Sequence, residues 1–136
     1  MNEHRASSGQ ADADTVQNRN RFLIVSLGSI GARYLRNLRV LQPDAEIAVL
    51  RRPSSASQVV EGADRVIYDL EQALAFAPKA AIIASPASQH MSFALRLAEA
   101  GVHLFIEKPL AAELDDCENL IRLCRERKLT LAVGYT

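Results

Sequence analysis

Residues 22–31 read FLIVSLGSIG, a continuous apolar run that ends in a turn with two glycines. Four consecutive apolar side chains predict a strand that is buried on both of its faces. The residues that follow place Tyr34, Leu35 and Leu38 at helical spacing, so the turn joins this strand to a helix. The segment therefore predicts the first strand, turn and helix of an α/β fold.

The rest of the chain repeats this alternation of apolar strand and amphipathic helix. Further strands are predicted over residues 46–50, 65–68, 80–84, 102–106 and 130–133. Further helices are predicted over residues 70–76, 88–100 and 113–128. Parallel strands need crossover helices, so this order predicts an α/β fold with a doubly wound parallel sheet of about six strands.

The last two helices each carry one apolar stripe. The stripes are Met91, Ala94, Leu95 and Ala98 in the first, and Leu114, Cys117, Ile121 and Cys124 in the second. The two cysteines are separated by about 10.5 Å along the helix axis, whereas a disulfide needs Cα atoms within about 7 Å. We therefore expect two core cysteines, and the chain shows no spacing typical of metal ligands.

Composition excludes several classes of protein. The 136 residues include 16 basic and 16 acidic side chains, and 49% are apolar. A neutral chain of this kind is typical of one globular domain and argues against a nucleic-acid partner. No segment approaches the run of about 20 apolar residues that crosses a membrane, and the polar start does not resemble a signal peptide. We expect a cytoplasmic protein with a flexible polar tail over residues 1–20 and a folded domain over residues 21–136.

The glycine turn has the chemistry of a diphosphate-binding site. In dinucleotide-binding folds the pyrophosphate lies on free backbone N–H groups at the N-terminus of the first helix. Gly28 supplies the position of closest approach, and Gly31 lets the helix pack closely against the strand. Ser26 departs from the usual GxGxxG pattern, which has glycine there. A purely structural turn is the alternative interpretation.

Two arginines mark the end of the second strand. An acidic residue about 20 residues after the turn usually binds the ribose 2′-hydroxyl of NAD. Arg51 and Arg52 stand in this place. Guanidinium groups suit a 2′-phosphate through charge-assisted hydrogen bonds, which favours NADP over NAD. Two solvated loop arginines are the alternative.

The tripeptide Glu107-Lys108-Pro109 follows the strand predicted over residues 102–106. Ligands of open α/β sheets bind at the carboxyl ends of the strands, which is where this tripeptide falls. A partly desolvated lysine at such a place can hold or donate a proton at a reacting hydroxyl. A solvated ion pair is the alternative interpretation.

Four elements in this order resemble the Gfo/Idh/MocA family, named after glucose–fructose oxidoreductase and inositol dehydrogenase. They are Gly28-Ser29-Ile30-Gly31, Ala84-Ser85-Pro86 with His90, Ala100-Gly101 leading to Glu107-Lys108-Pro109-Leu110, and Val133-Gly134-Tyr135. The resemblance covers residues 21–136, and its Glu-Lys-Pro element is specific, whereas the glycine turn alone is not. It implies a Rossmann-type domain of an oxidoreductase that transfers hydride between NADP or NAD and a sugar or polyol.

The resemblance also implies a role for each matching residue. Four residues would contact the pyrophosphate: Gly28, Ser29, Ile30 and Gly31. Arg51 and Arg52 would contact the adenosine ribose, while Ser85 and Pro86 would run beside the cofactor with His90 near them. Glu107 would approach the nicotinamide ribose, and Lys108 would face the substrate hydroxyl or keto group and handle its proton. An ordinary helix residue is the alternative for His90.

Family members have a second α/β domain that supplies most of the substrate pocket, and this chain stops at Thr136, where the family often has asparagine. We therefore expect a fragment that binds cofactor and has little activity alone. A stand-alone module that senses a dinucleotide or binds a partner is the alternative. A domain for another adenine ligand is a third reading, against which the Glu-Lys-Pro element speaks. Apolar surface left by the absent domain predicts self-association.

Overall fold

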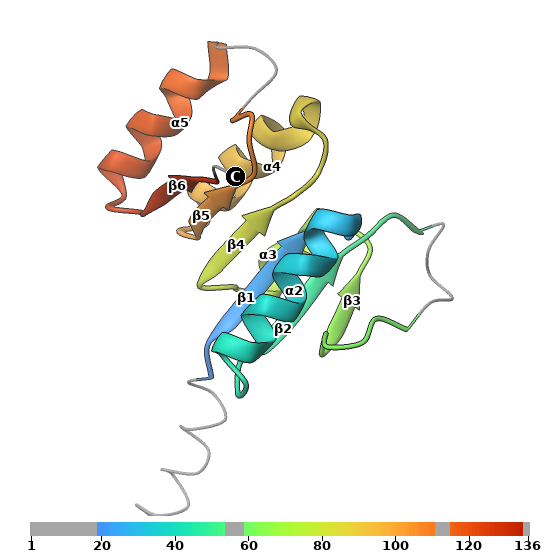
Figure 1. The fold of residues 1–136 in the computed structure, drawn as a ribbon. Coiled ribbons are helices and arrows are strands. Elements are labelled where there is room, and N and C mark those ends of the chain that lie inside the picture. Colours follow the sequence, from blue (N-terminus) through green and yellow to red (C-terminus); the bar gives the residue numbers. More distant parts are fainter. Residues whose placement is uncertain (1–18, 54–58, 111–114, 135–136) are drawn as a thin grey trace, which may run out of the picture.

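The computed structural model describes residues 19–53, 59–110 and 115–134, which form six strands and four α-helices (Figure 1). The strands are β1 (Arg21–Val25), β2 (Glu46–Leu50), β3 (Arg65–Ile67), β4 (Ala80–Ile83), β5 (His103–Ile106) and β6 (Leu131–Val133). The helices are α2 (Ser29–Leu41), α3 (Leu70–Phe76), α4 (Ala87–Glu99) and α5 (Asp115–Glu126). Nearly all of the tail predicted over residues 1–20 lies outside the described residues.

All six strands are parallel and lie in the order β3-β2-β1-β4-β5-β6, which confirms the predicted doubly wound sheet. The chain runs outward from β1 to β2 and β3, and then returns to the other side of β1 as β4. Val25 at the end of β1 therefore pairs with Leu50 on one side and with Ile83 on the other. This change of direction opens a crevice at the carboxyl edge of the sheet.

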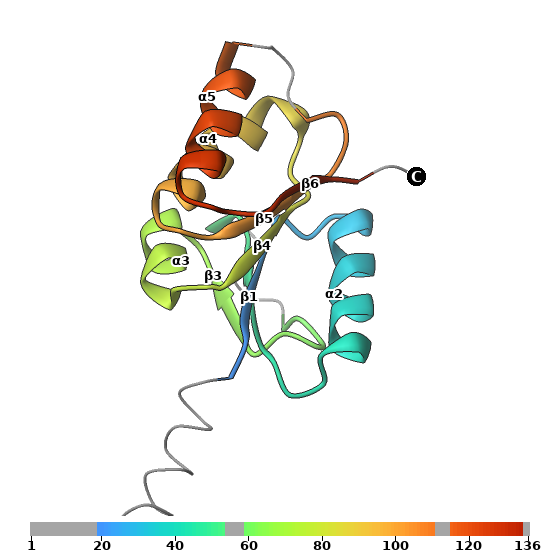
Figure 2. The ribbon, with the colours of Figure 1, turned by 90° about the vertical axis from the view of Figure 1, so that its left-hand side faces the viewer.

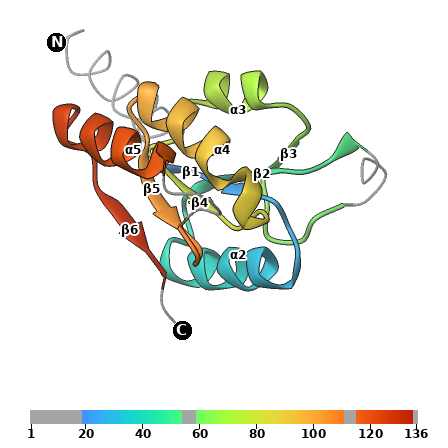
Figure 3. The ribbon, with the colours of Figure 1, turned by 90° about the horizontal axis from the view of Figure 1, so that it is seen from above.

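The helices cover the two faces of the sheet unequally (Figures 2 and 3). Helix α2 lies on one face, whereas α3, α4 and α5 lie on the other. Leu23 and Val25 belong to the core shared with α3, α4 and α5, and Ile24 belongs to the smaller core under α2. Strand β1 is thus buried on both faces, which explains its uninterrupted apolar sequence.

The predicted stripe of α5 is wrong at Ile121, and its first member, Leu114, lies outside the described residues. Leu120 is fully buried between the two cysteines of the stripe, whereas Ile121 is 42% exposed. The positions three and four residues after Cys117 lie on either side of its helical face, and packing against α4 selects the nearer one. In α4, likewise, Leu97 is fully buried and Leu95 only half-buried. Cys117 and Cys124 are buried and form no disulfide, as expected.

An apolar groove lies beside α2, on the part of that sheet face which the helix does not cover. Its lining is almost entirely apolar and includes Phe22, Tyr34, Ile82, Phe105 and Ala132. The self-association expected from the sequence would use this kind of surface, and it stays a prediction.

Within the described ranges, no helix is long and apolar enough to cross a membrane. The same residues gather no group of three His, Cys, Asp or Glu side chains that could hold a metal ion.

Asp64 ties α2 to β2. Arg39 donates a hydrogen bond to Asp64 Oδ2 at 2.7 Å, and the backbone N–H of Ile47 donates to the same oxygen at 2.8 Å. Burial by itself would raise the pKa of Asp64, but these two donors outweigh it and hold the pKa below its ordinary value. A carboxyl whose pKa is lowered in the folded state stabilises the protein at neutral pH, and this stabilisation is lost as the pH falls through the folded-state pKa.

We expect Asp64→Asn to lower the free energy of unfolding at pH 7 and to flatten its decline from about pH 5 to about pH 3. The amide can still accept from Ile47 but no longer attracts the Arg39 guanidinium. Urea unfolding followed by circular dichroism at a series of pH values measures both effects. Glu71→Gln is the control, because its ion pair with Arg96 is exposed and contributes little. Parallel pH profiles for Asp64→Asn and the unaltered protein would contradict the prediction.

Candidate functional site

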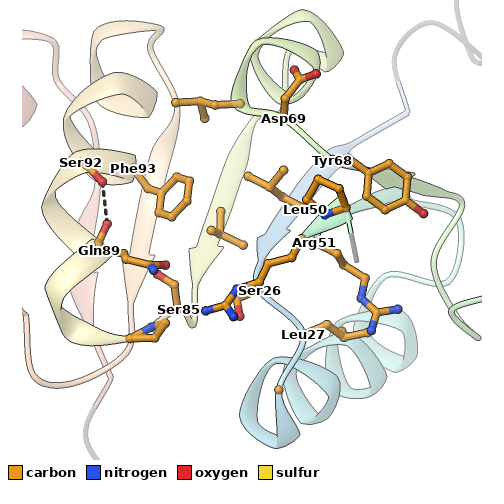
Figure 4. Close-up of a pocket in the computed structure, with 16 residues that line it drawn as sticks. Ser26, Leu27, Leu50, Arg51, Tyr68, Asp69, Ser85, Gln89, Ser92 and Phe93 are labelled. Carbon is orange, nitrogen blue, oxygen red and sulfur yellow. Dashed lines mark hydrogen bonds between the residues drawn. The ribbon is translucent and has the colours of Figure 1, made fainter. Parts of the chain in front are cut away.

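A pocket of about 680 Å³ lies at the carboxyl edge of the sheet, where the chain changes direction (Figure 4). Its lining residues come from the ends of β1, β2, β3 and β4 and from the segments that follow them. They are Val25, Ser26, Leu27, Gly28, Leu50, Arg51, Arg52, Pro53, Tyr68, Asp69, Leu70, Ser85, Pro86, Gln89, Ser92 and Phe93. Five residues predicted for the site are therefore brought together here: Gly28, Arg51, Arg52, Ser85 and Pro86. The other predicted residues lie outside this lining: Ser29, Ile30, Gly31, His90, Glu107 and Lys108.

Gly28 is the N-cap residue of α2 and faces open space. Its backbone is extended, with φ −77° and ψ −165°, a conformation open to any residue. A Cβ atom built on Gly28 would meet no atom within 4 Å. Neither backbone conformation nor packing therefore requires glycine here. The unpaired N–H groups of the first helical turn and the helix dipole make this end of α2 suitable for an anion.

Gly31, by contrast, is required by packing. A Cβ atom at this position would lie 2.3 Å from the carbonyl oxygen of Ser26. Ser26 itself has φ 76°, in the left-handed region that costs a residue with a side chain about 1–2 kcal/mol. Its N–H donates to the Leu50 carbonyl at 2.9 Å. Ser26 thus adopts a conformation that favours glycine, at the position where the sequence departs from the GxGxxG pattern.

Ser85 places an unused hydroxyl in the pocket. The residue follows β4 and is only 6% exposed, yet its Oγ atom has no hydrogen-bond partner among the described residues. A buried hydroxyl without a partner costs about 1–3 kcal/mol. Such a group is suited to donate to a ligand that enters the pocket. Pro86 follows it, lines the same pocket and is the N-cap residue of α4.

The two arginines follow β2 at the opposite side of the pocket. The backbone N–H of Arg51 donates to the Ile67 carbonyl at 2.8 Å, which holds the end of β2 against β3. Arg51 is half-buried and Arg52 is exposed. Figure 4 shows Arg51 near Tyr68 and Leu27, facing α4 across the pocket. This side of the pocket therefore presents positive charge.

Sequence analysis missed several lining residues. Tyr68 and Asp69 directly follow β3, so the rule that drew attention to the end of β2 would also have found them. The Asp69 carboxylate caps α3, where Oδ1 accepts from the Gln72 N–H at 2.7 Å. Gln89, Ser92 and Phe93 share one face of α4 through spacings of three and four residues. Sequence analysis singled out the apolar stripe of this helix, and these three residues lie outside that stripe.

Glu107 is buried at the carboxyl end of β5. Its N–H continues the strand pairing by donating to the Ile83 carbonyl at 2.9 Å, and its side chain is held by the Tyr34 hydroxyl, which donates to Oε2. Burial, together with the neighbouring carboxylate, raises the pKa of Tyr34 to about 12. The sequence analysis identified Tyr34 only as one of the residues at helical spacing. Lys108 is exposed, and its peptide bond to Pro109 is cis.

His90 connects two strand-end turns from behind the pocket. The side chain is 1% exposed, and its Nδ1 atom lies 3.0 Å from the Pro109 carbonyl oxygen. The other ring nitrogen contacts the Ser85 carbonyl oxygen. His90 therefore joins the turn after β4 to the turn after β5.

Comparison with known proteins agrees with this geometry. Residues 20–135 match the family described as "Oxidoreductase family, NAD-binding Rossmann fold". The chain belongs to this family, Gfo/Idh/MocA. It is 30% identical over 121 residues to 2,7-anhydro-N-acetylneuraminate hydratase of Mediterraneibacter gnavus, covering 84% of this chain and 31% of the relative. It is also 30% identical over 114 residues to the myo-inositol dehydrogenase Hyg17 of Streptomyces leeuwenhoekii, covering 82% and 35%.

Solved structures of Gfo/Idh/MocA proteins share the fold. The WlbA dehydrogenase of Chromobacterium violaceum, solved in complex with NADH and UDP-GlcNAcA, superposes with a TM-score of 0.75 at 27% identity. The matching region covers 85% of this chain and 35% of that structure. The chain thus spans about a third of the length of the relatives that it matches. The matched family is described as an oxidoreductase family with an NAD-binding Rossmann fold, and this chain supplies that fold.

We expect the same substitution to affect folding unequally at the two glycines of the turn. Gly31→Ala should lower the free energy of unfolding by about 2–3 kcal/mol, because the new Cβ would overlap the Ser26 carbonyl. Gly28→Ala should change it by less than about 0.5 kcal/mol, since its Cβ points into open space. Urea unfolding of both variants tests this. Equal destabilisation by the two substitutions would contradict the assignment of Gly31 to packing and of Gly28 to the pocket.

Proposed function

We propose that this domain binds NAD(P) in the pocket between β1, β2 and β4. It would serve an oxidoreductase that transfers hydride between the nicotinamide and a hydroxyl or keto group of a sugar or polyol. The observation that carries the proposal is Gly28, a glycine that neither its backbone nor its neighbours require, at the N-terminus of a helix. The unpaired Ser85 hydroxyl supports it from the other side of the pocket.

The turn after β1 would hold the diphosphate. Backbone N–H groups around Gly28, Ser29, Ile30 and Gly31 would donate to it, and the partial positive charge at the start of α2 would add to the attraction. The Ser85 hydroxyl would donate a hydrogen bond to the cofactor, and Pro86 would lie beside the cofactor. His90 would act indirectly, because its ring contacts the carbonyl oxygen of Ser85 rather than the pocket.

Arg51 and Arg52 would bind the adenosine ribose end. Both line the pocket directly after Leu50, the last residue of β2, in the place where a carboxylate would bind a ribose 2′-hydroxyl. The nearby Asp69 carboxylate already accepts from the backbone of α3. Two guanidinium groups suit a 2′-phosphate better than a free hydroxyl. We therefore infer a preference for NADPH over NADH.

The segment after β5 would act at the substrate. The nicotinamide of the bound cofactor supplies the hydride acceptor or donor. Glu107 would contact the nicotinamide ribose, and Lys108 would lie at the substrate hydroxyl or keto group. In the oxidative direction, the side chain of Lys108 would take the proton of the hydroxyl group while hydride leaves the carbon that bears this group. Reduction would reverse both transfers. Lys108 lies outside the nucleotide pocket, so both ligands could be held at once.

The substrate class rests on the family. Two of the relatives are named for inositol and for a nucleotide sugar, which supports a sugar or polyol for this protein as well. The relatives carry about twice as much additional chain beyond the matched third, and that part would position the substrate. We therefore expect residues 1–136 to bind cofactor but to show little turnover by themselves.

Cofactor binding is tested by isothermal titration of NADH and NADPH into the protein and into Gly28→Val. The valine side chain would fill the space in front of the helix, and affinity for both nucleotides should fall by at least about tenfold. Ala75→Val also ends in a valine side chain, at an exposed position of α3, and should leave affinity unchanged. The proposal fails if the unaltered protein binds neither nucleotide, or if Gly28→Val binds them as well as the unaltered protein does.

Replacing both Arg51 and Arg52 by alanine should lower affinity for NADPH by about tenfold or more, because the 2′-phosphate loses its charged partners. Affinity for NADH should change by less than about threefold, since NADH lacks that phosphate. The same titrations measure both values, and the loss should shrink as the salt concentration rises. A preference of the unaltered protein for NADH would overturn the assignment of NADPH while leaving the binding site itself in place.

A further inference from the structure

Tyr34 and Glu107 form a bridge across the carboxyl edge of the sheet. Tyr34 lies in the second turn of α2, the helix that begins at the glycine turn, and Glu107 follows β5. The Tyr34 hydroxyl donates to Glu107 Oε2, although the two residues are 73 positions apart in the sequence. The bridge thus joins the element that begins at Gly28 to the tripeptide that contains Lys108.

Both ends of the bridge are fixed by their surroundings. The Tyr34 ring packs edge-on against Phe105, with ring centroids 5.4 Å apart and an interplanar angle of 69°. A Cβ atom on Gly134 of the neighbouring segment would lie 3.2 Å from Glu107 Oε2, so a side chain at position 134 would crowd the carboxylate. The Glu107 backbone is held by the Ile83 carbonyl. The Glu107 backbone and the Tyr34 ring are therefore each held by a contact of their own.

The bridge also has a fixed direction of donation. Glu107 is only 8% exposed, and a buried carboxylate needs a hydrogen-bond donor. Because the pKa of Tyr34 is raised to about 12, the phenol keeps its proton throughout the physiological range. One bond to Oε2 leaves the carboxylate with further capacity to accept, which a ribose hydroxyl could use.

We propose that Tyr34 is a positioning residue, which sets the Glu107 carboxylate for the nicotinamide ribose of the cofactor. This inference rests on the proposed function, and it adds a residue on α2 that acts on the nicotinamide half through Glu107 alone. Tyr34 does not line the pocket proposed for the nucleotide. Its hydroxyl should therefore matter for nucleotides that carry the second ribose and not for those that end at the diphosphate.

The experiment compares three ligands by isothermal titration: NADH, ADP-ribose and ADP. ADP-ribose keeps the second ribose without nicotinamide, and ADP ends at the β-phosphate. Tyr34→Phe keeps the ring and its packing but removes the donor. It should weaken NADH and ADP-ribose by about tenfold and leave ADP within about twofold. Glu107→Gln should show the same selective loss, and the double variant should lose little more than either single variant.

Leu38→Ala is the matched structural control, because it removes packing one turn further along α2 and leaves the Tyr34–Phe105 ring contact, the Tyr34 hydroxyl and Glu107 in place. It should lower the midpoint of thermal unfolding without changing the ratio of NADH to ADP affinity. Equal losses for all three ligands in Tyr34→Phe, or no loss for NADH, would overturn the inference while cofactor binding stands. An unaltered protein that binds none of the three ligands would overturn both the proposed function and this inference.

Discussion

The contact between the backbones of Gly31 and Ser26 is the constraint on which the site depends. The carbonyl oxygen of Ser26 occupies the space where a side chain of α2 would otherwise lie. Ser26 accepts a left-handed conformation at this contact and still pairs with Leu50. Strain of about 1–2 kcal/mol is thus held next to a pocket. The buried β1, packed on both faces, offsets it, because burying each large apolar side chain contributes about 1.5–3 kcal/mol.

The order of the strands then distributes the chemistry along one edge. Arg51 follows β2, Ser85 follows β4 and Glu107 follows β5, with β1 and its glycine turn between the first two. Neighbouring strands lie about 4.8 Å apart, so the ends of β2 and β5 are separated by about 14 Å. A ligand that reaches both ends must be extended, with its charged middle over the turn after β1. A dinucleotide has this shape, and a mononucleotide would reach only half of the row.

The sequence predicted those parts of this arrangement that depend only on residues close together in the chain. The apolar run before Ser26 and the glycine turn after it follow from burial and from backbone sterics, and both are read directly from neighbouring residues. The choice of Leu120 over Ile121 depends instead on how α5 is tilted against α4, which helical spacing does not contain. The contact of Tyr34 with Glu107 depends even more strongly on the folded structure. Its ring fits an apolar stripe, and only the folded sheet brings Glu107 to its hydroxyl.

The distribution of roles also explains why the described residues say more about cofactor than about substrate. The pocket is lined by strand ends that would serve the adenosine and diphosphate, whereas Lys108 is exposed outside it. Relatives that share this third of their length carry the names of a hydratase and of dehydrogenases for different sugars and polyols. A region common to such different reactions cannot itself select among their substrates. What it can hold constant is the geometry between the glycine turn, proposed here to hold the diphosphate, and Lys108, proposed here to handle the proton. The bridge from Tyr34 to Glu107 joins the helix after the turn to the residue before Lys108.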